Sequence, residues 1–192
     1  QGDLSCGIRE GGALSCWGDP AAGMTEPPEG EFRALALGFY RGCAITADGL
    51  DVECWGCLSG DRPAGVLFGC NGNRDPPSFD LDLPRTSSPF VDIGHGEDFA
   101  CARREDGTTV CWGSNSDGKS DPGPAPLTAL SVGWNHACGL LASGEAHCWG
   151  YGHETWPAGP FVALSAGASH TCGLRPDQTV ACWGHPDYLW CE

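Results

Sequence analysis

Short apolar segments recur along the chain, each seven residues long and each ending in glycine. Apolar residues occupy the first and fourth positions of every such segment, and four further residues lead to a cysteine. Short apolar runs closed by a turn residue are typical of β-strands. The predicted strands are residues 32–38, 90–96, 127–133 and 161–167.

Two cysteines then bracket a predicted hairpin, and the second of them begins the motif Cys-Trp-Gly, which occurs five times. Nine residues separate the cysteines in four copies, which predicts three-residue turns at 10–12, 105–107, 142–144 and 176–178. Ten separate them in the second copy, where Asp48-Gly49 predicts a two-residue turn. Cysteines placed in this way face each other across the hairpin, within disulfide reach. The predicted disulfides are Cys6–Cys16, Cys43–Cys54, Cys101–Cys111, Cys138–Cys148 and Cys172–Cys182.

Strand alternation places each tryptophan of Cys-Trp-Gly on the face opposite its cysteine. Both faces of each small sheet then carry bulky groups, as in a propeller blade or an interior solenoid layer. We therefore predict an all-β fold that forms a single repeat domain over residues 1–192. Its units are residues 1–31, 32–89 with an insertion at 57–89, 90–126, 127–160 and 161–192.

Composition places this chain outside the cytosol. Thirteen cysteines in 192 residues indicate an oxidising compartment, and the 30 glycines and 15 prolines suit short strands joined by many turns. The net charge of −15 argues against nucleic acid as a partner, because no basic surface is available to neutralise phosphates. No apolar run is long enough for membrane insertion, and no signal peptide is present, so we expect a mature, secreted, extracellular chain.

Three cysteines lie outside the regular pairs. Cys57 and Cys70 fall in the insertion and most simply pair with each other, although either could instead pair with Cys191. An odd cysteine in a secreted protein indicates an intermolecular bridge or a free thiol, so Cys191 is the candidate for an intermolecular disulfide.

The segments Phe161–Leu174 and Thr179–Gly184 resemble the repeat of the regulator-of-chromosome-condensation family, and Trp112–Lys119 resembles its Trp-Gly-x-Asn-x-x-Gly-Gln linker. The resemblance covers about five repeats. It extends to the extracellular, cysteine-paired versions found in bacterial secreted proteins and in crinkly-type receptor ectodomains. It implies a β-propeller, although propellers of the family usually have seven blades.

The first unit lacks a leading strand, and Tyr188-Leu189-Trp190 could supply it from the other end of the chain. Closure in this way would remove exposed sheet edges. A closed five-bladed ring, an open arc that associates with other copies, and a fragment of a longer propeller all remain compatible with the sequence.

No catalytic motif is present, so we expect no enzyme, no cofactor and no metal site. The histidines His136 and His170 occupy a repeated position, which favours a structural role. His95-Gly-Glu97-Asp98 is too short to define a metal site, and Lys119 stands where a calcium loop needs an oxygen ligand.

The residues after the strand glycines are predicted to form short loops, and their contents vary between copies while the scaffold does not: 39–41, 97–99, 134–136 and 168–170. Aromatic and arginine residues, such as those in these loops, are typical of interface hot spots. We predict a non-enzymatic binder of a protein or carbohydrate partner. The alternative is a structural subunit of an extracellular filament, coat or matrix, assembled by self-association. The candidate partner-binding residues are Phe39, Tyr40, Arg41, Glu97, Asp98, Trp134 and Asn135.

Overall fold

The computed structural model describes residues 4–18, 25–38, 41–56, 88–152 and 156–184. The chain forms two compact units, Gln1–Ile93 and Gly94–Glu192, each of which is described by itself. The described residues are all-β, with one short 3₁₀ turn, η2 (Ser116–Gly118). Among them, no helix has the length and apolar character needed to cross a membrane.

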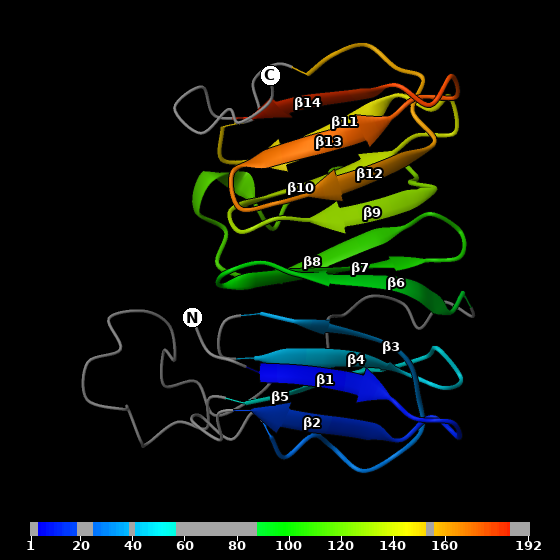
Figure 1. The fold of residues 1–192 in the computed structure, drawn as a ribbon, viewed down its shortest axis with the longest axis vertical. Coiled ribbons are helices and arrows are strands. Elements are labelled where there is room, and N and C mark those ends of the chain that lie inside the picture. Colours follow the sequence, from blue (N-terminus) through cyan, green and yellow to red (C-terminus); the bar gives the residue numbers. More distant parts are fainter. Residues whose placement is uncertain (1–3, 19–24, 39–40, 57–87, 153–155, 185–192) are drawn as a thin grey trace. The chain divides into compact units, whose positions relative to one another are not determined.

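Small antiparallel sheets make up both units (Figure 1). The first unit holds the two-stranded sheet β1–β2 and the three-stranded sheet β3–β4–β5. Their bounds are β1 (Leu4–Ile8), β2 (Leu14–Gly18), β3 (Phe32–Leu37), β4 (Gly42–Thr46) and β5 (Val52–Trp55).

The second unit holds the three-stranded sheets β9–β10–β11 and β12–β13–β14 and most of the sheet β6–β7–β8, whose strand β6 includes the boundary between Ile93 and Gly94. In chain order, the bounds of the first two sheets are β6 (Phe90–His95), β7 (Phe99–Arg104), β8 (Thr109–Gly113), β9 (Ala129–Val132), β10 (His136–Leu140) and β11 (Ala146–Gly150). The last sheet consists of β12 (Ala163–Ala166), β13 (His170–Leu174) and β14 (Val180–Gly184).

All four predicted leading strands are confirmed, as β3, β6, β9 and β12. Two of them begin later than predicted, at Ala129 and Ala163. The preceding residues Leu127 and Phe161 turn their N–H groups toward the neighbouring hairpin, onto the carbonyls of Gly107 and Gly144. These first residues therefore connect two sheets rather than extend one.

The predicted cysteine pairs are confirmed in all five hairpins. The two cysteines of each pair lie directly opposite each other on the two strands of their hairpin, as the spacing of the cysteines predicted. The disulfides are Cys6–Cys16, Cys43–Cys54, Cys101–Cys111, Cys138–Cys148 and Cys172–Cys182.

The hairpin turns follow the prediction in four copies and depart from it in one. A backbone hydrogen bond encloses three residues in each of the four, as from Arg104 N–H to Thr108 C=O at 2.8 Å. The predicted two-residue turn at Asp48-Gly49 is wrong. Thr46 N–H bonds to Asp51 C=O instead, which leaves four residues in the loop, and Asp48 Oδ1 accepts the N–H of Leu50 at 3.0 Å.

A disulfide of one sheet packs against the tryptophan of the next sheet, and we call this interface a seam. Cys138 and Cys148 lie in one cluster with Phe161 and Trp183 of the following sheet. Trp149, which neighbours Cys148 in sequence, packs instead against Phe99 and Cys101 of the preceding sheet. The prediction that tryptophan and cysteine use opposite faces is thereby confirmed.

The first unit repeats this packing, with Trp55 beside Phe32 and against the Cys6–Cys16 sheet. Trp17 differs, since 57% of it is exposed. No sheet precedes its own in the described part of the chain, so the face that carries Trp17 has no seam there.

A second contact joins successive sheets at the hairpin turns. Four hairpin turns contain a glycine with positive φ, and its carbonyl accepts the N–H of the first residue of the next leading segment at 2.7–2.9 Å. The four glycines are Gly12, Gly49, Gly107 and Gly144. A Cβ at Gly107 or at Gly144 would lie 2.9 Å from the Cβ of the next segment's proline, so a side chain does not fit there.

The fifth turn breaks this rule, with Gln178 at φ 69 where the others have glycine. Its neighbour Asp177 accepts hydrogen bonds from the hydroxyl and the N–H of Thr179 at 2.7 and 3.0 Å. These bonds from Thr179 hold the pKa of the Asp177 carboxyl below its usual value. Gln178 is exposed, which explains how a side chain is tolerated at this position.

Removing a disulfide from inside a seam should cost more than removing one from a free face. Cys138–Cys148 and Cys172–Cys182 have the same sequence separation of 10, so chain entropy contributes about 3 kcal/mol to each. We expect Cys138→Ala/Cys148→Ala to lose on the order of 1–2 kcal/mol more, through lost packing. Urea unfolding at low protein concentration measures the difference, and equal losses would contradict the seam.

The turn glycines give a second prediction. Gly107→Ala should destabilise the protein by about 2–4 kcal/mol, because it combines left-handed backbone strain with a clash against Pro126. Gln178→Gly is the matched control, since it changes the backbone preference without a clash and should shift stability by less than about 1 kcal/mol. Thermal unfolding of both variants tests the comparison.

Candidate functional site

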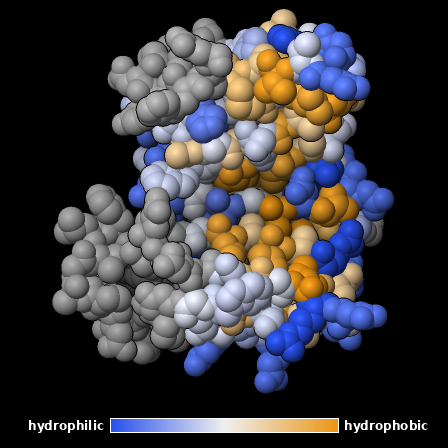
Figure 2. Space-filling model, in the orientation of Figure 1, coloured by the Kyte–Doolittle hydropathy of each residue, from blue (hydrophilic) through white to orange (hydrophobic). Residues whose placement is uncertain are grey.

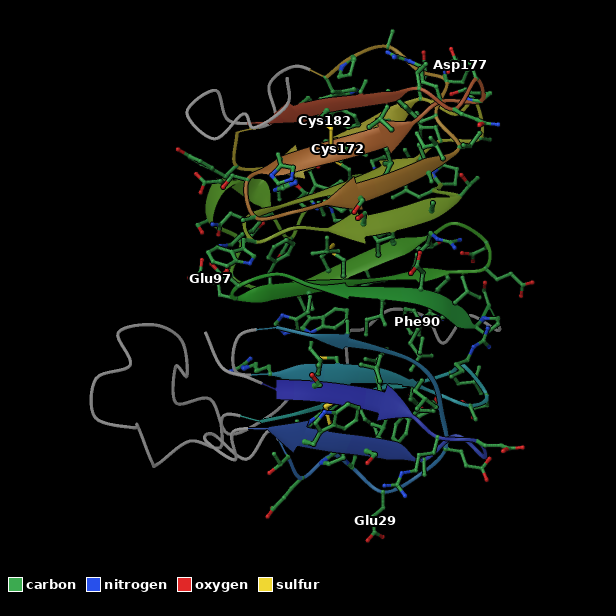
Figure 3. The ribbon with its side chains drawn as sticks, in the orientation of Figure 1. Glu29, Phe90, Glu97, Cys172, Asp177 and Cys182 are labelled. Atoms are coloured by element: carbon green, nitrogen blue, oxygen red, sulfur yellow. A yellow bond between two sulfur atoms is a disulfide. The ribbon has the colours of Figure 1, made fainter. Side chains whose placement is uncertain are left out.

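The loops after the leading strands are two-residue tips. In each, the N–H of the strand glycine donates to the carbonyl three residues later, as from Gly96 to Phe99 at 2.8 Å and from Gly133 to His136 at 2.8 Å. In unit 2 the tips are residues 97–98, 134–135 and 168–169. They lie at the strand ends away from the hairpin turns, as Glu97 and Asp177 show in Figure 3.

The segments predicted as loops are therefore partly strand. Phe99 and His136 belong to β7 and β10 and are each 1% exposed, so they pack in the interior and take no part in the surface. Arg41 is half-buried, and its carbonyl accepts the N–H of Gly38. Phe39 and Tyr40 lie outside the described residues.

Four predicted site residues gather in unit 2. The N–H of Glu97 donates to the carbonyl of Trp134 at 2.9 Å, which joins the tip of one sheet to the tip of the next. The side chain of Trp134 remains 45% exposed beside this junction. The neighbouring Asn135 offers its carbonyl to the N–H of Tyr151, also at 2.9 Å.

Lys119 lies beneath these tips and connects them. Its side chain is 4% exposed, and its Nζ is 2.6 Å from Asp98 Oδ1 and 3.5 Å from Asn135 Oδ1. The ammonium also lies 5.9 Å from the centre of the Phe99 ring, and the Lys119 carbonyl accepts Trp149 Nε1 at 3.0 Å. We call Glu97, Asp98, Lys119, Trp134 and Asn135 the rim cluster.

Burial explains why this geometry fixes the tips. A buried ammonium needs a charged or strongly polar partner, because its desolvation is otherwise uncompensated. Lys119 therefore holds Asp98 and Asn135, one from each tip, at fixed positions. Trp134 is presented to solvent from a braced loop, so little conformational entropy would be lost when it binds a partner.

Lys119 and Tyr151 were missed as members of this site. Lys119 was noted as the end of the linker and as unsuited to a calcium loop, but it is also the single lysine of the chain and replaces the glutamine of the linker pattern. This departure from the linker pattern was the feature of the sequence that could have indicated a special role for Lys119. Tyr151, 49% exposed, follows a Cys-Trp-Gly motif and carried no such signal.

The polar side chains considered as metal ligands lie within hydrogen-bond distance of backbone groups. His95 Nδ1 lies 2.6 Å from the carbonyl of Gly96, and Asn115 Oδ1 accepts the N–H of Ser120 at 2.9 Å. Within the described ranges, no three His, Cys, Asp or Glu side chains converge as a metal site. Cys57, Cys70 and Cys191, like Tyr188-Leu189-Trp190, lie outside those ranges.

Comparison with known sequences confirms the resemblance inferred from the repeats. Residues 90–119, 127–154 and 161–188 match the regulator of chromosome condensation (RCC1) repeat. Together with the five small sheets and their internal disulfides, this match defines a β-propeller with RCC1-type repeats. No curated protein matches the chain.

Solved structures agree on the fold. The ectodomain of the Physcomitrella patens receptor kinase CR4 is 24% identical, with a TM-score of 0.70 over 96% of this chain and 50% of that one. The CRINKLY WD40 ectodomain of the Arabidopsis thaliana receptor kinase ACR4 is 26% identical, with a TM-score of 0.69 over 96% and 61%. This chain thus spans between half and about three fifths of these relatives.

A third similar structure is that of a yeast protein. Prp20p from Saccharomyces cerevisiae is 15% identical, with a TM-score of 0.69 over 97% of this chain and 56% of that one. Its structure was described together with its binding to Gsp1p and histones. Identity at this level establishes a shared fold.

The contacts of the rim cluster indicate that removing Asp98 and removing the charge of Lys119 will affect stability to different extents. Asp98→Ala leaves a buried ammonium without its carboxylate and should destabilise the protein by about 1–3 kcal/mol. Lys119→Gln removes the charge but keeps hydrogen-bonding capacity, and should cost less. The double variant should be more stable than the sum of the single effects predicts, which denaturant unfolding of all four proteins measures.

Proposed function

We propose that this chain is a non-enzymatic, extracellular propeller that binds a protein partner through the rim cluster, with Trp134 as the anchor. The observation that supports the proposal most directly is the exposure of Trp134 on a tip braced by the Lys119–Asp98 ion pair. Tryptophan on a rigid support is the residue type most enriched at the energetic centre of interfaces.

The surroundings of Trp134 suit a polar partner surface. Glu97 joins Trp134 through a backbone hydrogen bond, the Asp98 carboxylate pairs with Lys119, and Tyr151, whose N–H donates to the Asn135 carbonyl, contributes a second aromatic residue that is 49% exposed. Aromatic anchors within a polar rim are typical of protein interfaces. A carbohydrate is the other partner class that these groups fit, since an indole stacks on sugar rings and carboxylates accept hydroxyl hydrogens.

The extracellular setting is supported by the five disulfides and by the ectodomain relatives. Disulfides of this kind persist where thiols are not kept reduced. A scaffold pinned in every repeat also tolerates variation at the tips, because the hairpins remain closed whatever the tip residues are.

The test is capture by the immobilised full chain, with Trp134→Ala compared with wild type. We expect partners captured by the wild type to bind Trp134→Ala about 30-fold more weakly, the effect of losing a tryptophan hot spot. Val162→Ala is the matched control, because Val162 is 57% exposed in the same unit but lies at the hairpin-turn end. A glycan array run with the same three proteins separates the two partner classes.

Tyr40→Ala provides a second variant, at a predicted partner-binding residue that lies outside the described residues. Circular dichroism should show that all variants stay folded, and for Trp134→Ala and Val162→Ala this is expected because the two residues are 45% and 57% exposed. Undiminished capture by both Trp134→Ala and Tyr40→Ala would refute binding through the rim.

The alternative function is a structural subunit of an extracellular filament, coat or matrix. The exposed Trp17 and Val180, at 57% and 61%, favour it because sheet faces of this kind are covered elsewhere in the chain. Electrophoresis without and with reductant examines the role of Cys191. A ladder that collapses on reduction supports disulfide-linked assembly, and a single monomer band favours the binder.

A further inference from the structure

The arginines of unit 2 lie at the hairpin-turn ends of its strands. Among the described residues of this unit they are Arg103, Arg104 and Arg175. The first two precede the turn at 105–107 and the third precedes the turn at 176–178, and both turns contain carboxylates as well. The turn end of unit 2 therefore contains charges of both signs.

The tip end differs, because its cation is buried. Apart from histidines, Lys119 is the one basic residue at this end in the described part of unit 2, and its side chain is 4% exposed beside Asp98. Glu97, Asp98 and Asp117 are all exposed there. Asp117 reaches the tips through its linker, in which the N–H of Ser114 donates to the Asp98 carbonyl at 2.9 Å. These three carboxylates less one ammonium leave a local net charge of −2.

Hydropathy alone does not separate the two ends. Figure 2 shows hydrophilic side chains at both strand ends of unit 2, with apolar side chains over part of the sheets between them. The sign of the exposed charge separates the ends, since the tip end offers carboxylates. The field at the tips therefore attracts cations, in the same sense as the net charge of −15 on the whole chain.

Two exposed aromatic residues lie at the same end as these carboxylates. Trp134 is 45% exposed and Tyr151 is 49% exposed. The N–H of Tyr151 donates to the Asn135 carbonyl, and the N–H of Glu97 donates to the Trp134 carbonyl, each at 2.9 Å. Backbone hydrogen bonds thus hold two aromatic residues and an acidic residue in adjacent segments of the rim.

We propose that the partner segment bound by the rim cluster is basic and that it places an arginine side chain on the Trp134 indole. This inference rests on the proposed function, because it specifies the chemistry of the protein that the rim binds. A guanidinium group is flat, stacks on aromatic faces and donates paired hydrogen bonds to carboxylates. An exposed indole in a field of carboxylates offers both kinds of contact.

The paired carboxylate of Asp98 remains available to such a partner. Its Oδ1 lies 2.6 Å from Lys119 Nζ, but the Asp98 side chain is 41% exposed. A carboxylate has about four acceptor positions, so Asp98 can hold Lys119 and accept a further donor. The buried amine of Lys119 meanwhile fixes the position of this carboxylate before the partner arrives.

The same charges select against other partner segments. An acidic segment would bring like charges together at the tips, at a cost in affinity and in association rate. A neutral apolar segment would cover the indole but would desolvate carboxylates without replacing their hydrogen bonds. Charge complementarity therefore favours a cationic segment.

Selection from random peptides tests the rim and its preference together. Peptides displayed on phage are selected on the immobilised full chain, and those that still bind Trp134→Ala are removed. We expect the remaining peptides to be enriched in arginine. Trp134-dependent peptides without this enrichment would overturn the basic partner and leave rim binding intact, whereas a lack of Trp134-dependent peptides would overturn both.

An isosteric pair of peptides measures the contribution of the charge. One selected peptide is synthesised with arginine and again with citrulline, which keeps the shape of the side chain and has no charge. We expect the arginine form to bind about tenfold more tightly in fluorescence anisotropy, because a hydrogen bond from a charged donor is lost in the other. The difference should shrink at high salt. Equal affinities of the two peptides would refute the proposal.

Matched carboxylate variants locate the effect on the molecule. Glu97→Gln removes an exposed charge from a tip, and Glu105→Gln removes an exposed charge from the hairpin turn of the same sheet. We expect Glu97→Gln to weaken binding of the arginine peptide about threefold and Glu105→Gln to leave it unchanged. Neither variant should alter binding of the citrulline peptide. Equal losses from both variants would indicate attraction by the overall charge and would contradict recognition at the rim.

Discussion

The contact between a disulfide and a tryptophan of the next sheet is the constraint on which the rest of the structure depends. A two- or three-stranded sheet of five-residue strands cannot bury enough apolar surface to be stable alone. The disulfide closes each hairpin and offers a compact apolar surface, and the indole of the following sheet covers it, as Trp183 covers Cys138–Cys148. Because cysteine and tryptophan are adjacent in sequence, strand alternation sends them to opposite faces, so one sheet can pack against both of its neighbours, as β9–β10–β11 does.

The division between scaffold and surface follows from this arrangement. Everything that the repeats share is used in holding sheets together: the cysteines, the tryptophans, the turn glycines and the first apolar residue of each leading strand. The two-residue tips take no part in the packing of disulfides against tryptophans, so their sequences vary. At one place a tip has been made rigid again by Lys119, which a buried position forces into contact with Asp98 and Asn135. A tip that is both variable and braced is well suited to recognition.

Periodicity predicted the features that depend on neighbours in sequence. The leading strands, the cysteine registers and four of the five turns follow from spacing, because a hairpin is fixed by the residues within it. Asp48-Gly49 lies at the centre of its hairpin, but the register of Cys43 opposite Cys54 is compatible with a loop of two or of four residues, and the hydrogen bond from Thr46 N–H to Asp51 C=O leaves four. Phe99 and His136 were assigned to loops because their burial depends on the following sheet. The Lys119 contacts, which join residues 16 and 21 positions apart through tertiary packing, could not be read from any local pattern.

Lys119 is the single lysine among the ten basic residues, and its amine is enclosed by Asp98, Asn135 and the Phe99 ring. The remaining nine basic side chains (ten less this one) are arginines, whose guanidinium groups stay charged and do not undergo acylation or conjugation to ubiquitin. The folded chain therefore presents no lysine side chain to enzymes or reagents that modify amines. Such chemistry can reach Lys119 only when the rim opens, so acylation of this one residue would report the opening of a single site.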